Sequence, residues 1–221
     1  MRRGAALLIV LLGFAVSSFR ADAGDEAGPA QAPRTAEQLA ALRKLVLDGL
    51  ADPKPNVRVA AADAIVAAWP DSAPVLDEAL ASKSSEIRLE AVNLLSSEAL
   101  GDQRDRIRKK FDDAHADVRR QAVRIARRLP WPEAEPSFMR LIARDPEWIV
   151  RQEALRGLES LGTTNCLHAV LEGWIAERDA DRRRRYKRVL MAIVKTDCGD
   201  DEDAWRASIH KAELGARVAR K

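Results

Sequence analysis

Few side chains in this chain are spaced for catalysis. The three histidines, His115, His168 and His210, lie in separate segments, without the H-x3-H or H-E spacing that binds a metal. Ser160 in "GLESLG" is one residue away from the G-x-S-x-G nucleophile spacing, and neither a C-x-x-C pair nor a Gly-rich phosphate loop is found. We therefore predict no catalytic residue, no metal and no cofactor, and expect that the protein is not an enzyme.

The basic run "ADRRRRYKR" is the strongest candidate for a binding site. It contains a possible basic patch, made of Arg182, Arg183, Arg184 and Arg185. Residues 104–128 are also basic, with ten Lys or Arg against four acids. Such clusters bind polyanions or acidic proteins, but they also occur on ordinary solvated helix faces. Both interpretations stay open at this point.

The first residues have the pattern of a secretory signal peptide. Arg2 and Arg3 precede an apolar run from Ala5 to Val16, which is too short to span a bilayer, and Ala21-Asp22-Ala23 offers a cleavage site after Ala23. We therefore expect export to the periplasm or the extracellular space, with no transmembrane segment in the mature chain. Removal of residues 1–23 lowers Lys plus Arg from 37 to 34 and Asp plus Glu from 34 to 33, so the net charge becomes +1. Export and this small charge argue against nucleic acid as the partner.

Two cysteines, Cys166 and Cys198, would meet an oxidising compartment after export and could form a disulfide. They are 32 residues apart, and this is also the spacing of an internal repeat. Equivalent atoms in stacked repeats lie about 10 Å apart, whereas a disulfide needs Cα atoms within about 7 Å. The pairing is therefore left open.

Four segments resemble one another: "DPKPNVRVAAADAI", "SKSSEIRLEAVNLL", "DAHADVRRQAVRIA" and "DPEWIVRQEALRGL". Each begins with a turn or capping residue, Asp52, Ser82, Asp113 or Asp145, and the units follow at intervals of 30, 31 and 32 residues. A β-branched residue, an Arg and an Ala recur at fixed places: Val57, Arg58 and Ala61; Ile87, Arg88 and Ala91; Val118, Arg119 and Ala122; Val150, Arg151 and Ala154.

The repeated positions fit one face of a helix. Side chains four residues apart stack over one another, and the constant Ala permits a close crossing of two helices. We expect the Arg of one unit to pair with the acidic turn of a neighbouring unit, giving a ladder of shielded ion pairs. Each unit also has a second helical half. In two units "WPDSAP" or "WPEAEP" joins the halves, and there Trp69 and Trp131 are expected to cover the turn rather than stack on a ligand.

These units resemble HEAT-like repeats, the α-solenoid type also found in secreted bacterial HEAT-repeat proteins and in phycobilisome-lyase-related proteins. The resemblance covers residues 52–195. It implies an all-α fold, a right-handed α-solenoid of about five HEAT-like helix pairs, whose second helices usually line the inner surface. A solenoid also needs polar end pieces that stop further stacking.

The fifth unit departs from the pattern, because Arg182 replaces the β-branched residue and Tyr186 replaces the Ala. A charged, degenerate last helix is suited to an end cap. The acids 200–203 lack the calcium-loop order and are expected to cap the last helix. The predicted organisation is a signal peptide (1–23), a linker (24–34), an N-terminal capping helix (35–51), HEAT-like repeats (52–199, as 52–81, 82–112, 113–144, 145–176 and 177–199), and a C-terminal capping helix with a tail (200–221).

The sequence thus predicts an exported, bacterial, monomeric protein that acts as a non-enzymatic protein-interaction scaffold through the curved face of its solenoid. The partner is a protein of unknown identity. One alternative is a polyanion-binding protein that uses its basic helices. A second alternative is a lyase or chaperone-like enzyme related to the phycobilisome-lyase repeats.

Overall fold

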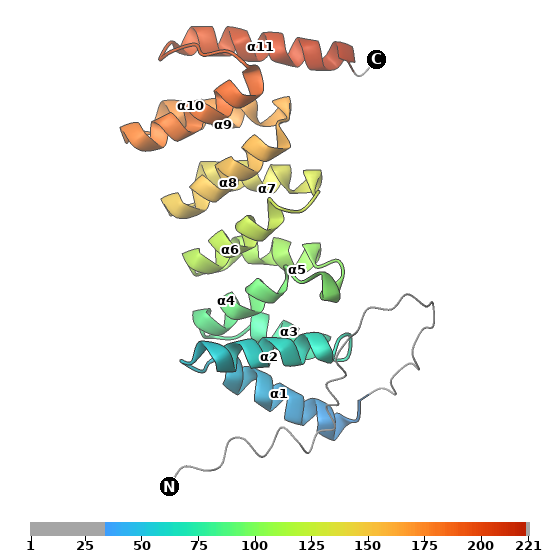
Figure 1. Ribbon diagram of the computed structural model, residues 1–221. Coiled ribbons are helices and arrows are strands. Elements are labelled where there is room, and N and C mark those ends of the chain that lie inside the picture. The colour runs from blue at the N-terminus through green and yellow to red at the C-terminus, as the bar shows by residue number, and fades with distance from the viewer. Residues whose placement is uncertain (1–33, 220–221) are drawn as a thin grey trace. The chain divides into compact units, whose positions relative to one another are not determined.

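The computed structural model describes residues 34–219 (Figure 1). The predicted signal peptide (1–23) and all but the last residue of the predicted linker (24–34) lie outside the described residues. The described secondary structure is helical throughout. The α-helices are α1 (Ala36–Leu50), α2 (Pro55–Ala67), α3 (Ala73–Leu80), α4 (Ser85–Leu94), α5 (Arg104–Lys109), α6 (Ala116–Ala126), α7 (Glu135–Arg144), α8 (Trp148–Leu161), α9 (Leu167–Ala176), α10 (Ala180–Val194) and α11 (Glu202–Ala219). Short 3-10 turns precede or follow several of them: η2 (Glu98–Leu100), η3 (Lys110–Asp112), η4 (Pro132–Ala134) and η5 (Thr164–Cys166).

The helices stack in chain order as two layers (Figure 1). The first helices of the units, α2, α4, α6, α8 and α10, form one layer, and the second helices, α3, α5, α7, α9 and α11, form the other. Each second helix packs against the first helix of the next unit, as α7 does on α8 and α9 does on α10, and first helices also pack on one another, as α6 does on α8. The prediction of an all-α solenoid is confirmed.

The two ends of the stack complete this scheme. Helix α1 packs mainly on α2, in the way that α7 packs on α8. It therefore takes the place of a second helix ahead of the first full unit. At the other end α11 packs on α9 and η5, the place of a second helix in the fifth unit. No helix within residues 34–219 combines the length and the apolar character needed to cross a membrane.

Capping residues set where several helices begin. Thr35 and Gln38 form a capping box at the start of α1, with each side chain accepting from the backbone N–H of the other residue. The side chains of Ser84 and Asp179 cap α4 and α10. Asp201 accepts from the backbone N–H of Ala204, so the predicted capping role of the acidic run is confirmed at this residue.

The repeated alanines lie where helices approach one another closely. Ala61, Ala91, Ala122 and Ala154 are all buried. A Cβ placed on Gly49 of α1 would come within 2.7 Å of the Ala61 Cβ, so the backbones of α1 and α2 nearly touch there. The β-branched position is buried at Val118 and Val150 and partly buried at Val57 and Ile87. The close crossing predicted from the constant Ala is thus present between α1 and α2.

Candidate functional site

The repeat arginines join consecutive units. Arg119 donates through Nε and Nη2 to the carboxylate of Asp145 in the next unit, at 2.7 and 2.9 Å. Its Nη1 donates to two backbone carbonyls at the start of its own unit, those of Asp113 and Ala114, at 2.9 and 3.2 Å. Because one guanidinium holds both turns, it fixes the spacing between units three and four. The predicted ladder is confirmed at this step.

Arg88 makes the same set of bonds one unit earlier. Its Nε and Nη2 each donate to the Asp113 carboxylate at 2.8 Å, and its Nη1 donates to the carbonyls of Ser82 and Lys83. Burial raises the pKa of Asp113, but the hydrogen bonds from Arg88 and from the backbone of His115 outweigh it, so the pKa lies below its ordinary value. The ionised pair is therefore favoured.

The ladder changes where the sequence changes. Ser82 supplies no carboxylate, and Arg58 instead donates to Glu90 Oε1 on α4 at 2.8 Å. In the fourth unit Arg151 pairs with Glu177, at 3.6 Å between Nη2 and Oε2. These arginines are committed to holding the units together, and this leaves the other basic residues as candidates for binding.

The predicted basic patch divides between two surroundings. Arg183 lies with its guanidinium 4.2 Å from the centre of the Trp174 ring, and its buried Nε has no hydrogen-bond partner within residues 34–219. Arg183 stands at the ladder position of the fifth unit, beyond which the described chain has no further unit. Arg182 lies 5.4 Å from the centre of the Trp148 ring, and Arg184 pairs with Asp181. The four arginines therefore do not form one patch.

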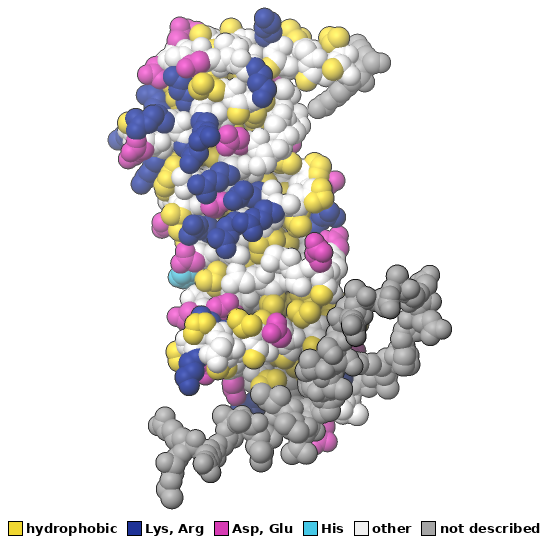
Figure 2. Space-filling model, in the orientation of Figure 1, with side chains coloured by type: hydrophobic (Ala, Val, Ile, Leu, Met, Phe, Trp, Pro, Cys, Tyr) yellow, Lys and Arg dark blue, Asp and Glu magenta, His cyan; other side chains and the backbone are white. Residues whose placement is uncertain are grey.

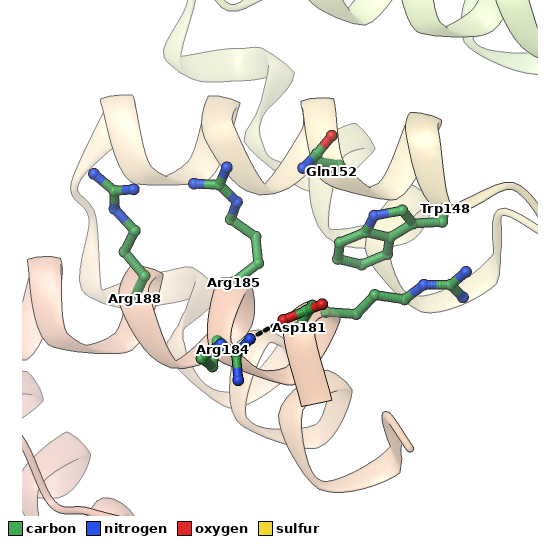
Figure 3. Close-up of a pocket in the computed structure, with 7 residues that line it drawn as sticks. Trp148, Gln152, Asp181, Arg184, Arg185 and Arg188 are labelled. Atoms are coloured by element: carbon green, nitrogen blue, oxygen red, sulfur yellow. Dashed lines mark hydrogen bonds and ion pairs between the residues drawn. The ribbon is translucent and has the colours of Figure 1, made fainter. Parts of the chain in front are cut away.

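A groove of about 360 Å³ lies between α8 and α10 (Figure 3). Arg185 and Arg188 extend from α10 toward α8, while Trp148 and Gln152 stand on α8 (Figure 3). Asp181 and Arg184 lie at the edge of the groove and Arg182 completes its lining. Sequence reasoning included Arg182, Arg184 and Arg185 but missed Trp148 and Gln152. A signal was available for Gln152, because it is the fourth-unit equivalent of Arg184 at a spacing of 32 residues.

The groove belongs to a longer basic surface on the first helices, which we call the arginine face. Adding the repeat spacing aligns Arg120 with Gln152 and Arg184, and Arg124 with Arg156 and Arg188. The arginine face is defined as Arg120, Arg124, Gln152, Arg156, Arg184, Arg185 and Arg188. Figure 2 shows Lys and Arg side chains gathered over α6, α8 and α10.

The arginine face begins only at the third unit. The positions equivalent to Arg120 are Val59 and Leu89 in the first two units. The positions equivalent to Arg124 are Asp63 and Asn93. Basic charge is therefore a property of the C-terminal part of this surface and is not required by the repeat itself.

The second helices carry charges that are largely paired with one another. Arg43 of α1 bonds Glu78 of α3, and Arg106 of α5 bonds Asp77 of α3 through both oxygens, at 2.7 and 2.8 Å. Further pairs join Arg140 to Asp112 and Arg206 to Glu172. Within residues 34–219, Arg120, Arg182 and Arg185 of the first helices have no carboxylate within 4.0 Å. Some second-layer arginines of the described chain, such as Arg144, are also unpaired, but the basic residues are most concentrated on α10, which has six of them against one acid.

The cysteines are free and lie in different surroundings. Cys166 is buried in η5 and donates to the Thr163 carbonyl, whereas Cys198 contacts the hydroxyl of Ser208. Burial raises the pKa of the Cys166 thiol to about 11. The disulfide left open from the sequence is not formed in this structure, where each thiol contacts groups of its own unit.

The two hinge tryptophans differ in burial. Trp131 is 2% exposed and stacks on Phe111, with ring centroids 6.3 Å apart. Trp69 is partly exposed, and the Arg106 guanidinium lies 5.7 Å from its ring centre. At Trp131 the predicted structural role is confirmed. Within residues 34–219 no cluster of three His, Cys, Asp or Glu side chains is placed to hold a metal ion.

The stacked units and their Arg–Asp ladder define the class of this protein, an α-solenoid of HEAT-like repeats. The HEAT repeats family matches residues 105–191, which covers the units that carry the arginine face. The chain therefore contains HEAT-like repeats in this region, and its fold is similar to that of a HEAT-like solenoid.

A solved structure with a similar fold is a chain of the complex of CpcE and CpcF of phycocyanin lyase from Nostoc sp. PCC7120. The two share 21% sequence identity with a TM-score of 0.51, and the match covers 70% of this chain and 98% of that chain. No curated protein matches this chain.

The expectation that the protein is not an enzyme is contradicted by this structural match, since the similar chain comes from a phycocyanin lyase. The lack of familiar catalytic motifs was the basis of that expectation. It is a weak basis for this fold, because a HEAT-like solenoid forms part of a lyase. At 21% identity the likeness establishes the fold, and it assigns no reaction to this chain.

Proposed function

We propose that this protein is a scaffold that binds a protein partner on the arginine face of its solenoid. The observation that carries the proposal is the contrast between the two layers. Arg106, Arg140 and Arg206 of the second layer pair with acids of a neighbouring unit. Arg120 and Arg185 on the first helices have no carboxylate partner within residues 34–219. A surface of like charge attracts an oppositely charged partner and discriminates against others.

The ladder supports this role because it makes the surface rigid. Arg88 and Arg119 each tie two units with several hydrogen bonds. Arg151 continues this linkage to the start of the fifth unit through Glu177. The helices α6, α8 and α10 are consequently held at fixed separations, so little backbone ordering entropy is lost when a partner binds. The complex of two chains in the similar lyase structure also supports a role in binding proteins.

The partner would be met after export. The leader pattern in residues 1–23 supports this part of the proposal. Mass spectrometry of the protein recovered from the producing cell tests it. A mature N-terminus at Gly24 is expected, and a chain that keeps residues 1–23 would contradict export with cleavage.

Affinity capture with matched variants tests the binding face. Arg120 and Arg184 are exposed and belong to the arginine face, so the double variant Arg120→Glu, Arg184→Glu is expected to lose the captured partner. Arg144 of α7 and Arg217 of α11 are exposed residues of the second layer, so the variant Arg144→Glu, Arg217→Glu has the same net charge and is expected to keep it. Equal capture by the two variants would contradict the proposed face.

A lyase activity is the second candidate, and the match to a phycocyanin lyase chain is what favours it. A direct assay of the purified chain with phycocyanin, alone and with its captured partner, tests this candidate. Absence of any reaction under both conditions would remove it.

A further inference from the structure

We propose that the groove between α8 and α10 binds an acidic peptide segment of the partner, with Arg185 and Arg188 receiving its carboxylates. The proposal rests on the proposed function and specifies where and by what chemistry the partner binds. It is carried by a difference between the fourth and the fifth unit.

In the fourth unit the equivalent place holds an internal acid. Glu153 is 2% exposed, and its carboxylate accepts from Arg127 Nε at 3.0 Å and from Arg156 Nη1 at 2.7 Å. The repeat spacing of 32 residues aligns Glu153 with Arg185 and Arg156 with Arg188. The same spacing aligns Arg127 with Glu159, so an arginine and the acid have exchanged positions and Arg185 takes the place of the buried carboxylate.

After this exchange the acid of the fifth-unit cluster serves only one of the two arginines. Arg188 reaches Glu159 at 3.5 Å between Nε and Oε1, an ion pair in which the arginine side chain is 66% exposed. Arg185 has no carboxylate within 4.0 Å among residues 34–219, and Asp181 is already paired with Arg184. An external carboxylate at Arg185 would pair with this unpartnered guanidinium.

The geometry suits a short run of acidic residues. Arg185 and Arg188 are three residues apart, so their side chains leave the same side of α10. A guanidinium offers a planar pair of donors that matches a carboxylate, and two such groups can receive two acidic side chains. Gln152 faces them from α8 and can donate its amide N–H to the same segment (Figure 3).

Trp148 argues for a peptide and against a nucleic acid. Guanidinium groups of Arg151 and Arg182 lie 5.5 and 5.4 Å from its ring centre, and the Tyr186 ring lies 6.1 Å away. These groups already fill space over the ring that a stacked base would need. Trp148 is also the only aromatic residue of the groove lining, whereas single-stranded nucleic acids are usually bound on several aromatic side chains. The Trp148 ring therefore packs against the Arg182 guanidinium and restricts its position.

The test uses fluorescence anisotropy of the full mature chain with a fluorescein-labelled Glu-Glu-Ala-Glu-Glu peptide, and with a Gln-Gln-Ala-Gln-Gln peptide of the same length. The glutamate peptide is expected to bind and the glutamine peptide is not. Arg185→Gln, Arg188→Gln should weaken binding about tenfold or more, since two charge-assisted hydrogen-bonding groups are lost. Arg185→Lys should keep part of the affinity, because it retains the charge without the planar donor pair.

The control is Arg144→Gln, Arg217→Gln, which removes the same charge from the second layer and should bind as the wild type does. Circular dichroism of both variants verifies that they are folded. Unchanged affinity of the Arg185, Arg188 variant, or equal binding of the glutamine peptide, would overturn the proposal. A heparin fragment or a single-stranded oligonucleotide that binds the groove more tightly than the glutamate peptide would overturn it in favour of a polyanion site.

The two proposals fail in different ways. Suppose that the Arg185→Gln, Arg188→Gln variant still captures the partner while Arg120→Glu, Arg184→Glu does not. The groove proposal is then wrong and the arginine face still stands. If neither variant affects capture, the proposed face itself is wrong.

Discussion

Arg119 and Asp145 illustrate how single residues hold the solenoid together. Their side chains are 11% and 3% exposed, and the pair is completed by two bonds from Arg119 to the backbone of its own unit. A buried pair is costly to break by removing one partner, because the remaining charge is left without compensation. The repeat arginine thus has a structural task in units two, three and four, which explains its recurrence.

Removing Arg119 should therefore destabilise the fold. We expect Arg119→Ala to lower the free energy of unfolding by about 3 kcal/mol, since the Asp145 carboxylate stays buried without its guanidinium. Urea denaturation followed by circular dichroism measures the change. Arg43→Ala is the control, because it breaks an exposed inter-helix pair and should have a much smaller effect. An unchanged thermal stability of Arg119→Ala would contradict the ladder's role.

The Arg88–Asp113 step gives a pH dependence with a defined sign. The pKa of Asp113 is lower in the folded state than its unfolded value of about 3.9. The stabilisation is therefore complete above the unfolded pKa and is lost as the pH falls through the lower folded-state pKa. The stability difference between wild type and Arg88→Ala should narrow as the pH is lowered from 6 to about 3. Urea denaturation at each pH measures this difference. A stability difference that stays constant between pH 6 and about pH 3 would contradict the predicted role of the Arg88–Asp113 pair.

At the scale of elements, the fifth unit shows how a solenoid absorbs a large residue. Tyr186 takes the slot of the repeated Ala on α10 and is buried, and its hydroxyl donates to the Ile142 carbonyl at 3.3 Å. Gly173 on α9 lies opposite, where the preceding unit has Leu141 at the equivalent position. In the preceding crossing the large residue, Leu141, lies on α7 and the small residue, Ala154, lies on α8. In this crossing the small residue lies on α9 and the large one on α10, so the helices can still pack closely.

Gly173→Ala should disrupt this arrangement. A Cβ at residue 173 would overlap the Tyr186 ring and lie 3.0 Å from its Cδ1. Either the ring or the helix would have to move to relieve this clash. We expect a loss of about 1–3 kcal/mol, measured as a lower thermal midpoint. Gly215→Ala in α11 is the control, since no atom lies within 4 Å of its new Cβ, and it should be neutral or stabilising. The effect of Gly173→Ala should shrink in a Tyr186→Leu background, and equal losses in both backgrounds would argue against the clash.

The repeat positions could be predicted because they recur. Val, Arg and Ala at fixed offsets predicted the helical units, the close crossing and the pairing of Arg with the next acidic turn. The role of Gly173 could not be predicted, because it depends on which residue of α9 faces Tyr186. The groove was missed in part for a similar reason: four consecutive arginines point in different directions around α10, and only the packed helix shows that Arg183 faces Trp174 while Arg185 faces α8.

At the scale of the whole described solenoid, charge is distributed unevenly along the first-helix layer. Helix α2 contains one basic and one acidic residue, whereas α10 contains six basic residues and one acid. The net charge of the whole 221-residue chain is only +3, so composition alone hides this asymmetry. A local excess of one sign steers an oppositely charged partner toward one part of a surface.

The association rate of an acidic ligand should accordingly fall as the salt concentration rises, whereas the thermal stability of the fold should hardly change. Raising NaCl from about 0.1 M to about 1 M shortens the Debye length from about 10 Å to about 3 Å. We expect the association rate of the labelled glutamate peptide to fall by about tenfold or more. The thermal midpoint should change little, because the ladder pairs are largely shielded from solvent. Stopped-flow anisotropy and a thermal melt at each salt concentration measure the two quantities, and an association rate independent of salt would contradict electrostatic steering.

Site-specific photocrosslinking tests the central claim most directly. A p-benzoylphenylalanine side chain is introduced at Arg120 on the arginine face, or at Arg144 in the second layer, and the full chain is irradiated with its captured partner. The proposed function predicts a crosslinked product from position 120 and none from position 144. Crosslinks from position 144 without any from position 120 would place the partner on the second helices and contradict the account.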